Sequence, residues 1–293
     1  MKKILKQILI TLTVVVFTGC GTGDERSSSG GNGKLIKVND LLPEAAKNVL
    51  LKTVRVTETD GTFYESEFFY EKNKLRMTYS ANGSLLYENT YEDIGDGLIT
   101  THRNINPEYE AELISKYKYK NKRLDTITDT YTDVVGIKKS DPKYKTKKVV
   151  SKVLKRKGSM ITEYVKKRYN DDKNLLETHE HKHEVDKLKI IREDTTITYS
   201  KHAKKAAGET HKSYTTNEYD DTLNTINPGS YGDEKTYVNN APGGVYMPSK
   251  MTYHDDQGGT FSQSTTFEFD SNGLMTKQIR GDSVITYKYI DKN

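Results

Sequence analysis

The stretch FEFDSNGLMTKQI, residues 267–279, carries the pattern from which the fold of this chain can be predicted. Phe267 and Phe269 stand two residues apart, an acidic and amide-rich turn follows, and Leu274 opens the next segment. Because residues at i and i+2 of a strand share a face, the stretch predicts a strand, a turn and a second strand with two rings on one face. Such a unit requires antiparallel neighbours.

The same pattern recurs along the chain at uneven intervals. Aromatic pairs at i and i+2 also occur at Phe68/Tyr70, Tyr117/Tyr119 and Tyr287/Tyr289. Related stretches occupy residues 68–80, 89–101, 117–128, 167–178, 217–226 and 287–293. Tyr and Thr are abundant between clusters of Asn, Asp and Gly, which indicates many short strands joined by turns.

These stretches resemble the tyrosine–aspartate (YD or RHS-type) repeats of exported bacterial proteins. The chain is also similar to uncharacterised repeat-bearing lipoproteins of Bacteroidetes, and the resemblance covers about residues 60–293. It implies an all-β fold, mainly an antiparallel meander that curls into an open or half barrel or shell. The resemblance carries over no catalytic residue. Many strands are polar on both faces, which favours a sheet around a wet lumen over one that spans a membrane.

One short helix is predicted before the strands begin. In NDLLPEAAKNVLLK, residues 39–52, Asn39 or Asp40 can cap the helix and Pro43 suits its first turn. Apolar residues then recur at helical spacing as far as Leu50. We expect this helix to cover one end or one face of the sheet.

The amino terminus predicts export and a lipid anchor. Residues 1–19 combine a basic leader with an apolar run, Ile8 to Phe17, that is shorter than the roughly 20 residues a membrane helix needs. The sequence FTGC at the end of this leader resembles a lipobox, which implies that Cys20 is acylated and holds the protein to the membrane. Residues 20–36 form a Gly- and Ser-rich tether, and residues 37–293 form the β-repeat domain. We expect a location in the cell envelope at the outer membrane, on its periplasmic or surface face.

Charge argues against nucleic acid as a partner. The formal net charge is +5, and without the three leader lysines 43 basic residues stand against 41 acidic ones. Most of the imbalance lies in residues 138–168, where 13 Lys and Arg accompany two acids. This basic block is a candidate contact for an anionic envelope glycan or lipid; the alternative is a pair of solvated strands.

Three of the seven histidines stand at 179, 181 and 183 in ETHEHKHEV, residues 177–185. The stretch spells H-E-x-x-H, but that zinc motif needs a helix, and this stretch alternates as a strand does. On a strand, His179, His181 and His183 share a face with successive pairs about 6.5–7 Å apart. They are a candidate metal site, with His202 or His211 as a possible third ligand from a neighbouring strand; the alternative is a hydrated polar strand.

A long Pro- and Gly-rich segment, residues 222–249, interrupts the strand pattern. It is a connector or a binding loop, in which Tyr231, Tyr237 and Tyr246 offer rings for stacking on a sugar. No catalytic motif and no cofactor-binding motif is recognisable. We therefore predict a lipid-anchored envelope protein that binds or scaffolds, with glycans or other envelope components as ligands. The alternatives are an envelope hydrolase with an unrecognised site and a lipid or lipoprotein carrier.

Overall fold

The computed structural model describes residues 36–71, 74–95, 97–104, 112–121, 123–131, 146–231 and 244–292. Cys20 and most of the predicted tether lie outside these residues. In chain order the strands of the described chain are β1 (Val49–Thr57), β2 (Phe63–Glu71), β3 (Lys74–Ala81), β4 (Ser84–Asp93), β5 (Gly97–Asn104), β6 (Glu112–Lys120), β7 (Arg123–Tyr131), β8 (Lys148–Lys157), β9 (Met160–Tyr169), β10 (Leu175–Asp186), β11 (Lys189–Tyr199), β12 (Thr210–Glu218), β13 (Lys250–Asp255), β14 (Thr260–Phe269), β15 (Met275–Arg280) and β16 (Ser283–Asp291). The same described residues also form three short helical turns, η1 (Val38–Leu41), α2 (Glu44–Lys47) and η3 (Pro228–Ser230).

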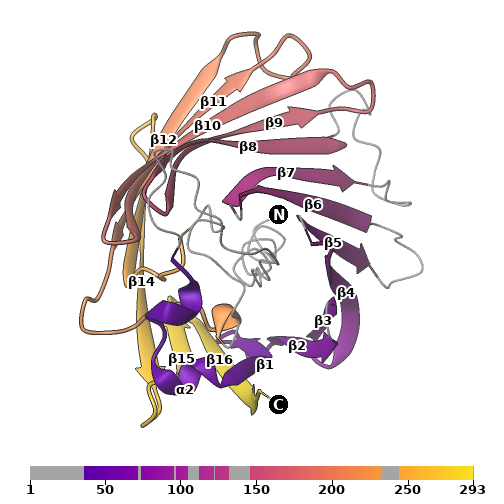
Figure 1. Ribbon diagram of the computed structural model, residues 1–293. Helices are drawn as coiled ribbons and strands as arrows, with labels where there is room; N and C mark the ends of the chain where they lie inside the picture. The colour runs from indigo at the N-terminus through magenta and orange to yellow at the C-terminus, as the bar shows by residue number, and fades with distance from the viewer. Residues whose placement is uncertain are drawn as a thin grey trace.

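The strands form one closed antiparallel barrel in which each pairs with its neighbours in sequence (Figure 1). The ring is completed by β16, which pairs with β1 from Val49↔Asp291 to Thr57↔Val284. The prediction of an all-β antiparallel meander is thus confirmed, but the open or half barrel is wrong. Closure has a physical advantage, because it leaves no strand edge with unpaired backbone groups.

The two ends of the barrel differ. At one end β1 begins, and there the segments 36–48, 219–231 and 244–249 form a plug. Buried plug residues pack against residues at the starts of four strands or just before them; the cluster comprises Val38, Leu42, Ala46, Ile226, Tyr231, Val245, Val49, Met160, Ile190 and Leu274. The opposite end, the rim, includes the described turns that follow odd-numbered strands, such as 58–62 and 281–282.

The predicted helix over residues 39–52 is much shorter than expected. Only η1 and the single turn α2 form, although Pro43 does stand at the N-cap of α2. Strand β1 begins at Val49 because the apolar residues from there onward alternate, with Val49, Leu51 and Val54 on the inner face. The turn α2 belongs to the plug, so its expected place at one end of the sheet is confirmed.

The inner face of the wall is rich in aromatic and aliphatic side chains. Pairing in register places Val54 beside Ser66, Ser66 beside Tyr79 and Tyr79 beside Tyr87, all facing the lumen. The predicted aromatic pairs share this face, since a second cluster brings together Leu51, Val54, Phe68, Leu75, Met77, Tyr91 and Leu98 with the half-buried Tyr70, Tyr117, Tyr119, Ile285, Tyr287 and Tyr289. Much of the lumen near the plugged end is therefore filled core.

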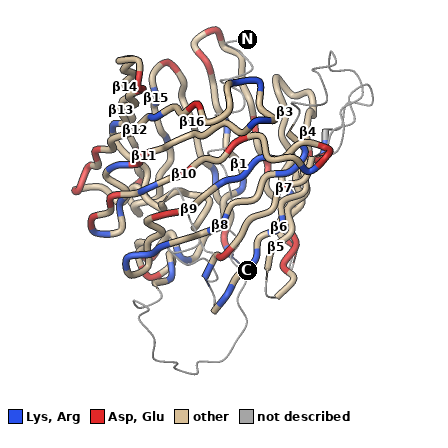
Figure 2. Tube along the Cα trace, turned by 90° about the horizontal axis from the view of Figure 1, so that it is seen from above, with Lys and Arg blue, Asp and Glu red and all other residues tan. Residues whose placement is uncertain are grey.

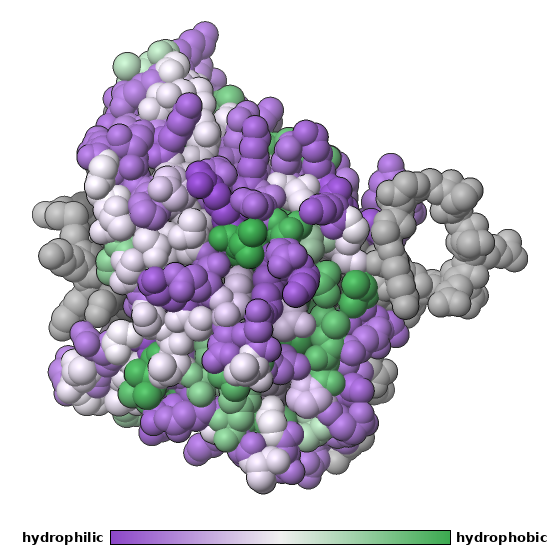
Figure 3. Space-filling model, turned by 90° about the vertical axis from the view of Figure 1, so that its left-hand side faces the viewer, coloured by the Kyte–Doolittle hydropathy of each residue, from purple (hydrophilic) through white to green (hydrophobic). Residues whose placement is uncertain are grey.

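The outer face carries charges and hydroxyls. Figure 2 shows basic and acidic residues on strands all around the wall, and the side seen in Figure 3 is mostly hydrophilic with separate apolar patches. Cross-strand ion pairs on this face include Arg55–Glu65, Lys52–Glu67, Arg76–Glu88, Lys152–Asp125, Lys155–Glu163, Lys250–Glu218 and Lys277–Glu268. Lipid-facing strands instead carry an apolar residue at every second position. Among the described residues, no helix is long and apolar enough to cross a bilayer.

Candidate functional site

The histidine stretch is a strand, as predicted, and lies in β10. Register with β9 and β11 places His179, His181 and His183 on the lumenal face, whereas Glu180 faces outward. In a zinc protease the glutamate must work beside its two histidines, so this arrangement excludes the H-E-x-x-H mechanism.

Glu193 of β11 organises the histidines. Its Oε1 accepts a hydrogen bond from His181 Nδ1 at 2.8 Å and one from the Tyr164 hydroxyl at 3.3 Å, and it lies 3.5 Å from His183 Nε2. The Tyr164 ring stacks on His181 at 4.2 Å between centroids. His183 donates from Nδ1 to the Ile161 carbonyl at 3.0 Å. We refer to these four side chains, with His179, as the histidine wall.

The protonation states of the histidine wall follow from burial and hydrogen bonding. Burial raises the pKa of the Glu193 carboxyl, but the hydrogen bond from His181 and the neighbouring His183 imidazole outweigh it and hold that pKa well below its usual range. Burial lowers the pKa of His181, although the hydrogen bond to Glu193 acts in the opposite direction. Glu193 is therefore ionised at neutral pH, and His181 is neutral with its proton on Nδ1.

The metal site stays a prediction. The Nε2 atoms of His179, His181 and His183 are buried and have no hydrogen-bond partner among the described residues. No group of three or more His, Cys, Asp or Glu side chains in that part of the chain is placed to hold a metal ion. His211 bonds instead to Glu209 at 3.0 Å, and His202 lies in the turn between β11 and β12.

The other candidate residues have different positions. Of the basic block 138–168, residues 146–168 are described, and they form the hairpin of β8 and β9. Outward lysines there are partly neutralised, since Lys152 pairs with Asp125 and Lys155 with Glu163. Two strands form, as in the alternative reading, but Lys166 and Arg168 face the lumen and are not solvated at the outer surface. The anionic partner stays a prediction.

The rings predicted to stack on a sugar lie in the plug or outside the described residues. Tyr231 is 2% exposed and stacks on Tyr289 at 5.5 Å, so its ring is already covered by the protein. Tyr246 pairs with Ile226 across an isolated bridge and lies under the Lys189 ammonium at 5.5 Å. Tyr237 lies outside the described residues.

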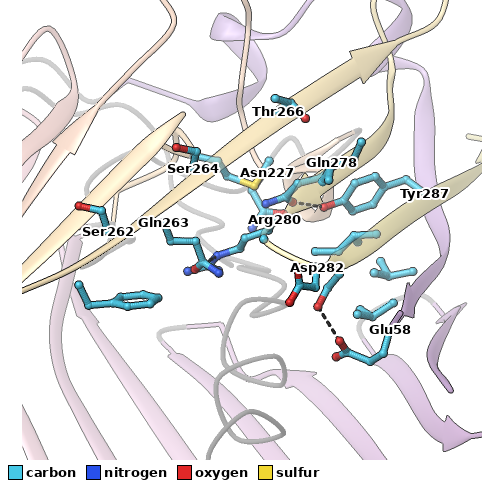
Figure 4. A pocket seen from close by; sticks show the side chains of 18 of the residues that line it. Glu58, Asn227, Ser262, Gln263, Ser264, Thr266, Gln278, Arg280, Asp282 and Tyr287 are labelled. Carbon is cyan, nitrogen blue, oxygen red and sulfur yellow. Dashed lines mark hydrogen bonds between the residues drawn. The ribbon is translucent and has the colours of Figure 1, made fainter. Parts of the chain in front are cut away.

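A cavity of about 580 Å³ lies in the lumen between the rim and the plug (Figure 4). Its wall comes from β1, β14, β15 and β16, and its floor includes Asn227 and Met247 of the plug. The apolar lining consists of Leu51, Val54, Val56, Met247, Phe261, Ile279 and Ile285. The charged groups of the lining, Glu58, Arg280 and Asp282, stand at the rim end.

Two amide side chains hold the polar groups of this cavity in place. Arg280 donates from Nε to Gln263 Oε1 at 2.6 Å, and Tyr287 donates from its hydroxyl to Gln278 Oε1 at 2.7 Å. Burial lowers the pKa of the Arg280 guanidinium, while Tyr287 acts in the opposite direction. Glu58 accepts from the Ser283 hydroxyl at 2.8 Å. We refer to this space as the Arg280 cavity.

Comparison with solved structures identifies the type of barrel. A porin-like protein from Bacteroides vulgatus has a similar structure, with a TM-score of 0.56 and 12% sequence identity over 83% of this chain and 99% of that chain. A porin-like protein from Bacteroides uniformis aligns with a TM-score of 0.43 and 12% identity, over 82% of this chain and 96% of that chain. No family model and no curated protein matches the chain. The first similarity establishes the porin-like barrel fold alone.

The Arg280 cavity was not predicted from the sequence, although the alternation of residues along two strands indicates which side chains line it. Gln263 has the same parity as Phe267 and Phe269 along one strand, and Arg280 alternates with Gln278 along the next. Extending the aromatic face by twos would have placed these polar residues on the inner wall. The cavity itself depends on the plug and on closure of the barrel.

Proposed function

We propose that this chain is a binding protein of the cell envelope whose lumen holds a ligand with an apolar body. The observation that carries this proposal is the distribution of polarity across the wall. Apolar and aromatic side chains line the lumen along β16 and β1 to β6, and ion pairs cover the outside. A lipid-facing barrel has the reverse arrangement, with an apolar exterior and a polar interior.

The size and lining of the Arg280 cavity support this proposal. Small-molecule sites have volumes of about 300–1,000 Å³, apolar walls and a few polar groups that set orientation. The cavity falls within this range, and Leu51, Val54 and Ile285 give it an apolar wall. A glycan has less support than an apolar ligand, because Tyr231 packs inside the plug. Among the alternatives considered from the sequence, the carrier is therefore favoured.

The leader sequence supports a location in the envelope. A lipobox at FTGC and a Gly- and Ser-rich segment after it are the features of a lipoprotein tethered through Cys20. The charged outer face suits a barrel that stands beside a membrane on such a tether. Under this proposal the acyl chains anchor the protein, while the lumen remains free for another molecule.

Binding of a neutral apolar probe tests this function. The chain carrying Cys20→Ser, which has no acyl chains of its own, is titrated with N-phenyl-1-naphthylamine, whose fluorescence rises in apolar surroundings. We expect saturable binding that Val56→Phe weakens about tenfold or more, because the added ring fills the cavity. Thr57→Phe adds the same ring at the next, outward-facing position and should leave the affinity unchanged.

Two further measurements make this test decisive. Circular dichroism and the melting temperature establish that each variant is folded, and Val56→Leu provides a smaller filling if the phenylalanine disturbs packing. The proposal would be overturned if Val56→Phe and Thr57→Phe lost affinity equally. It would also be overturned if the Cys20→Ser chain without a cavity substitution showed no saturable binding.

A further inference from the structure

Arg280 has no carboxylate partner among the described residues, unlike the lumenal Arg168 and Lys166. Arg168 pairs with Glu177 at 2.6 Å, and Lys166 faces Glu193 and Asp129, which act to raise its pKa against the effect of burial. No described carboxylate lies within ion-pair distance of Arg280, whose Nε bonds to the neutral Gln263. A half-buried cation held by an amide retains donors and charge for another group.

Arg280 places a positive charge at the rim end of the cavity. Arg280 is the last residue of β15, next to the rim turn at Gly281 and Asp282. Figure 4 shows its side chain beside Gln263 within the group of residues that line the cavity. Leu51 and Met247 lie farther toward the plug and give that part of the cavity an apolar surface. A ligand that matches this wall has a head near the rim and a chain that points toward the plug.

Two carboxylates set a limit on the charge of that head. Glu58 and Asp282 line the same cavity at its rim. The Glu58 carboxylate accepts a hydrogen bond from Ser283, and neither carboxylate pairs with Arg280. A head with several negative charges would meet repulsion from Glu58 and Asp282, whereas a singly charged head can contact the guanidinium alone.

We propose that the Arg280 cavity binds a single-chain amphiphile with one anionic head, and that Arg280 contacts this head. The chain of the amphiphile lies along Leu51, Val54 and Ile285 toward the plug. This inference rests on the proposed function, since it names the ligand class of the same lumenal cavity. A guanidinium suits a carboxylate or a sulfate because it presents several donors in one plane.

Three probes with the same chain and different heads test the inference. Calorimetric titration of the Cys20→Ser chain compares dodecanoate, dodecanol and dodecyltrimethylammonium, with the two ions kept below their micelle concentrations and dodecanol below its solubility limit. We expect dodecanoate to bind about tenfold or more tighter than dodecanol, because a charge-assisted hydrogen bond forms only with the anion. The cationic probe should bind weakest, and added salt should weaken dodecanoate more than dodecanol.

Two variants on one strand separate a contact with the head from a general effect of charge. Arg280→Gln should reduce the affinity for dodecanoate to that for dodecanol and leave dodecanol within about twofold. Lys277→Gln removes the same charge from the outer face of β15, where Lys277 pairs with Glu268, and should change neither affinity. Arg280→Lys keeps the charge, and should retain part of the preference if Arg280→Gln is poorly folded.

Failure of this inference and failure of the proposed function give different results. Equal binding of dodecanoate and dodecanol by the Cys20→Ser chain would overturn the role of Arg280 and leave the apolar cavity in place. Equal loss of both ligands in Arg280→Gln would also overturn that role. Absence of binding by all three probes would instead contradict the proposed function itself.

Discussion

The inner and outer faces of the barrel wall differ in the burial and the partners of their side chains. Pairs of adjacent residues of the same chemical type show this difference. In β2, Phe68 faces the lumen and is 1% exposed, whereas Phe69 faces outward and is 40% exposed beneath the Lys52 ammonium. In β11, Glu193 faces three side chains of the histidine wall, whereas Asp194 pairs with Arg192 in solvent. Side-chain type is the same within each pair, so alternation across the wall decides whether a residue builds the core or the surface.

Charged side chains have different roles on the outer face and in the lumen. Outer ion pairs such as Arg55–Glu65 are exposed to solvent and contribute little to stability individually. Inside, the histidine wall satisfies its own central carboxylate, whereas Arg280 lacks a carboxylate partner among the described residues. The Glu193 carboxylate is thus paired within the fold, whereas under the proposal above Arg280 contacts the head of a ligand.

The largest expected effect comes from truncating the inner ring of the Phe pair. Phe68→Ala should lower the free energy of unfolding by about 3–5 kcal/mol, because it leaves a void among Leu51, Leu75 and Met77. Phe69→Ala should cost about 1 kcal/mol or less, since it removes an exposed ring and its contact with Lys52. Urea denaturation of both variants measures the difference. Similar costs would contradict the assignment of inner and outer faces.

A smaller effect on the free energy of unfolding is expected for the adjacent acidic residues Glu193 and Asp194. Glu193→Gln should cost about 1–3 kcal/mol, because a neutral amide accepts less well and places its own donors among His181, His183 and Tyr164. Asp194→Asn, the next residue and outward-facing, should stay within about 0.5 kcal/mol. Thermal and urea unfolding provide the measurement. If Glu193→Gln cost no more than Asp194→Asn, the histidine wall would not be a structural network.

The repeated sequence pattern has a structural explanation that its spacing did not reveal. In most copies an aromatic residue ends an even-numbered strand and a Leu begins the next, as at Tyr91/Leu98 and Tyr119/Leu124. These copies therefore gather at the plugged end and fill the lumen there. The copy at residues 167–178 joins β9 to β10 and so lies at the rim instead. Uneven spacing reflects strands and connections of unequal length.

Closure and the cavity could not be predicted, because both depend on contacts between distant segments. The pairing of Val49–Thr57 with Ser283–Asp291 joins the two ends of the described chain, and alternation in either segment is compatible with an open edge. The plug likewise joins Leu42 to Ile226 and Val245. The predicted helix is longer than the observed one because Val49 and Leu50 fit a helical period and a strand period equally well. These two residues form part of a strand because they pair with β16.

The smallest expected effect is on the pH dependence of stability, where the inner face again differs from the outer. Burial lowers the pKa of His181, so the unfolded chain takes up this proton first as the pH falls through about 6.5, and stability decreases. Glu193 has a lowered pKa, so below about pH 5 the unfolded chain again binds the proton first and stability decreases further. Both inner groups therefore make the protein less stable in acid.

Two substitutions assign these losses to separate pH windows. His181→Gln should flatten the fall in unfolding midpoint between pH 7 and 5.5, and Glu193→Gln should flatten it between pH 5 and 3. His102, whose pKa burial also lowers, retains part of the upper slope, so the double variant with His102→Gln should be flatter still. Urea midpoints across this range measure both windows. A His181→Gln curve parallel to that of the unsubstituted chain would mean that His181 takes up its proton equally well folded and unfolded, and the inner wall would then be as open to water as the outer one.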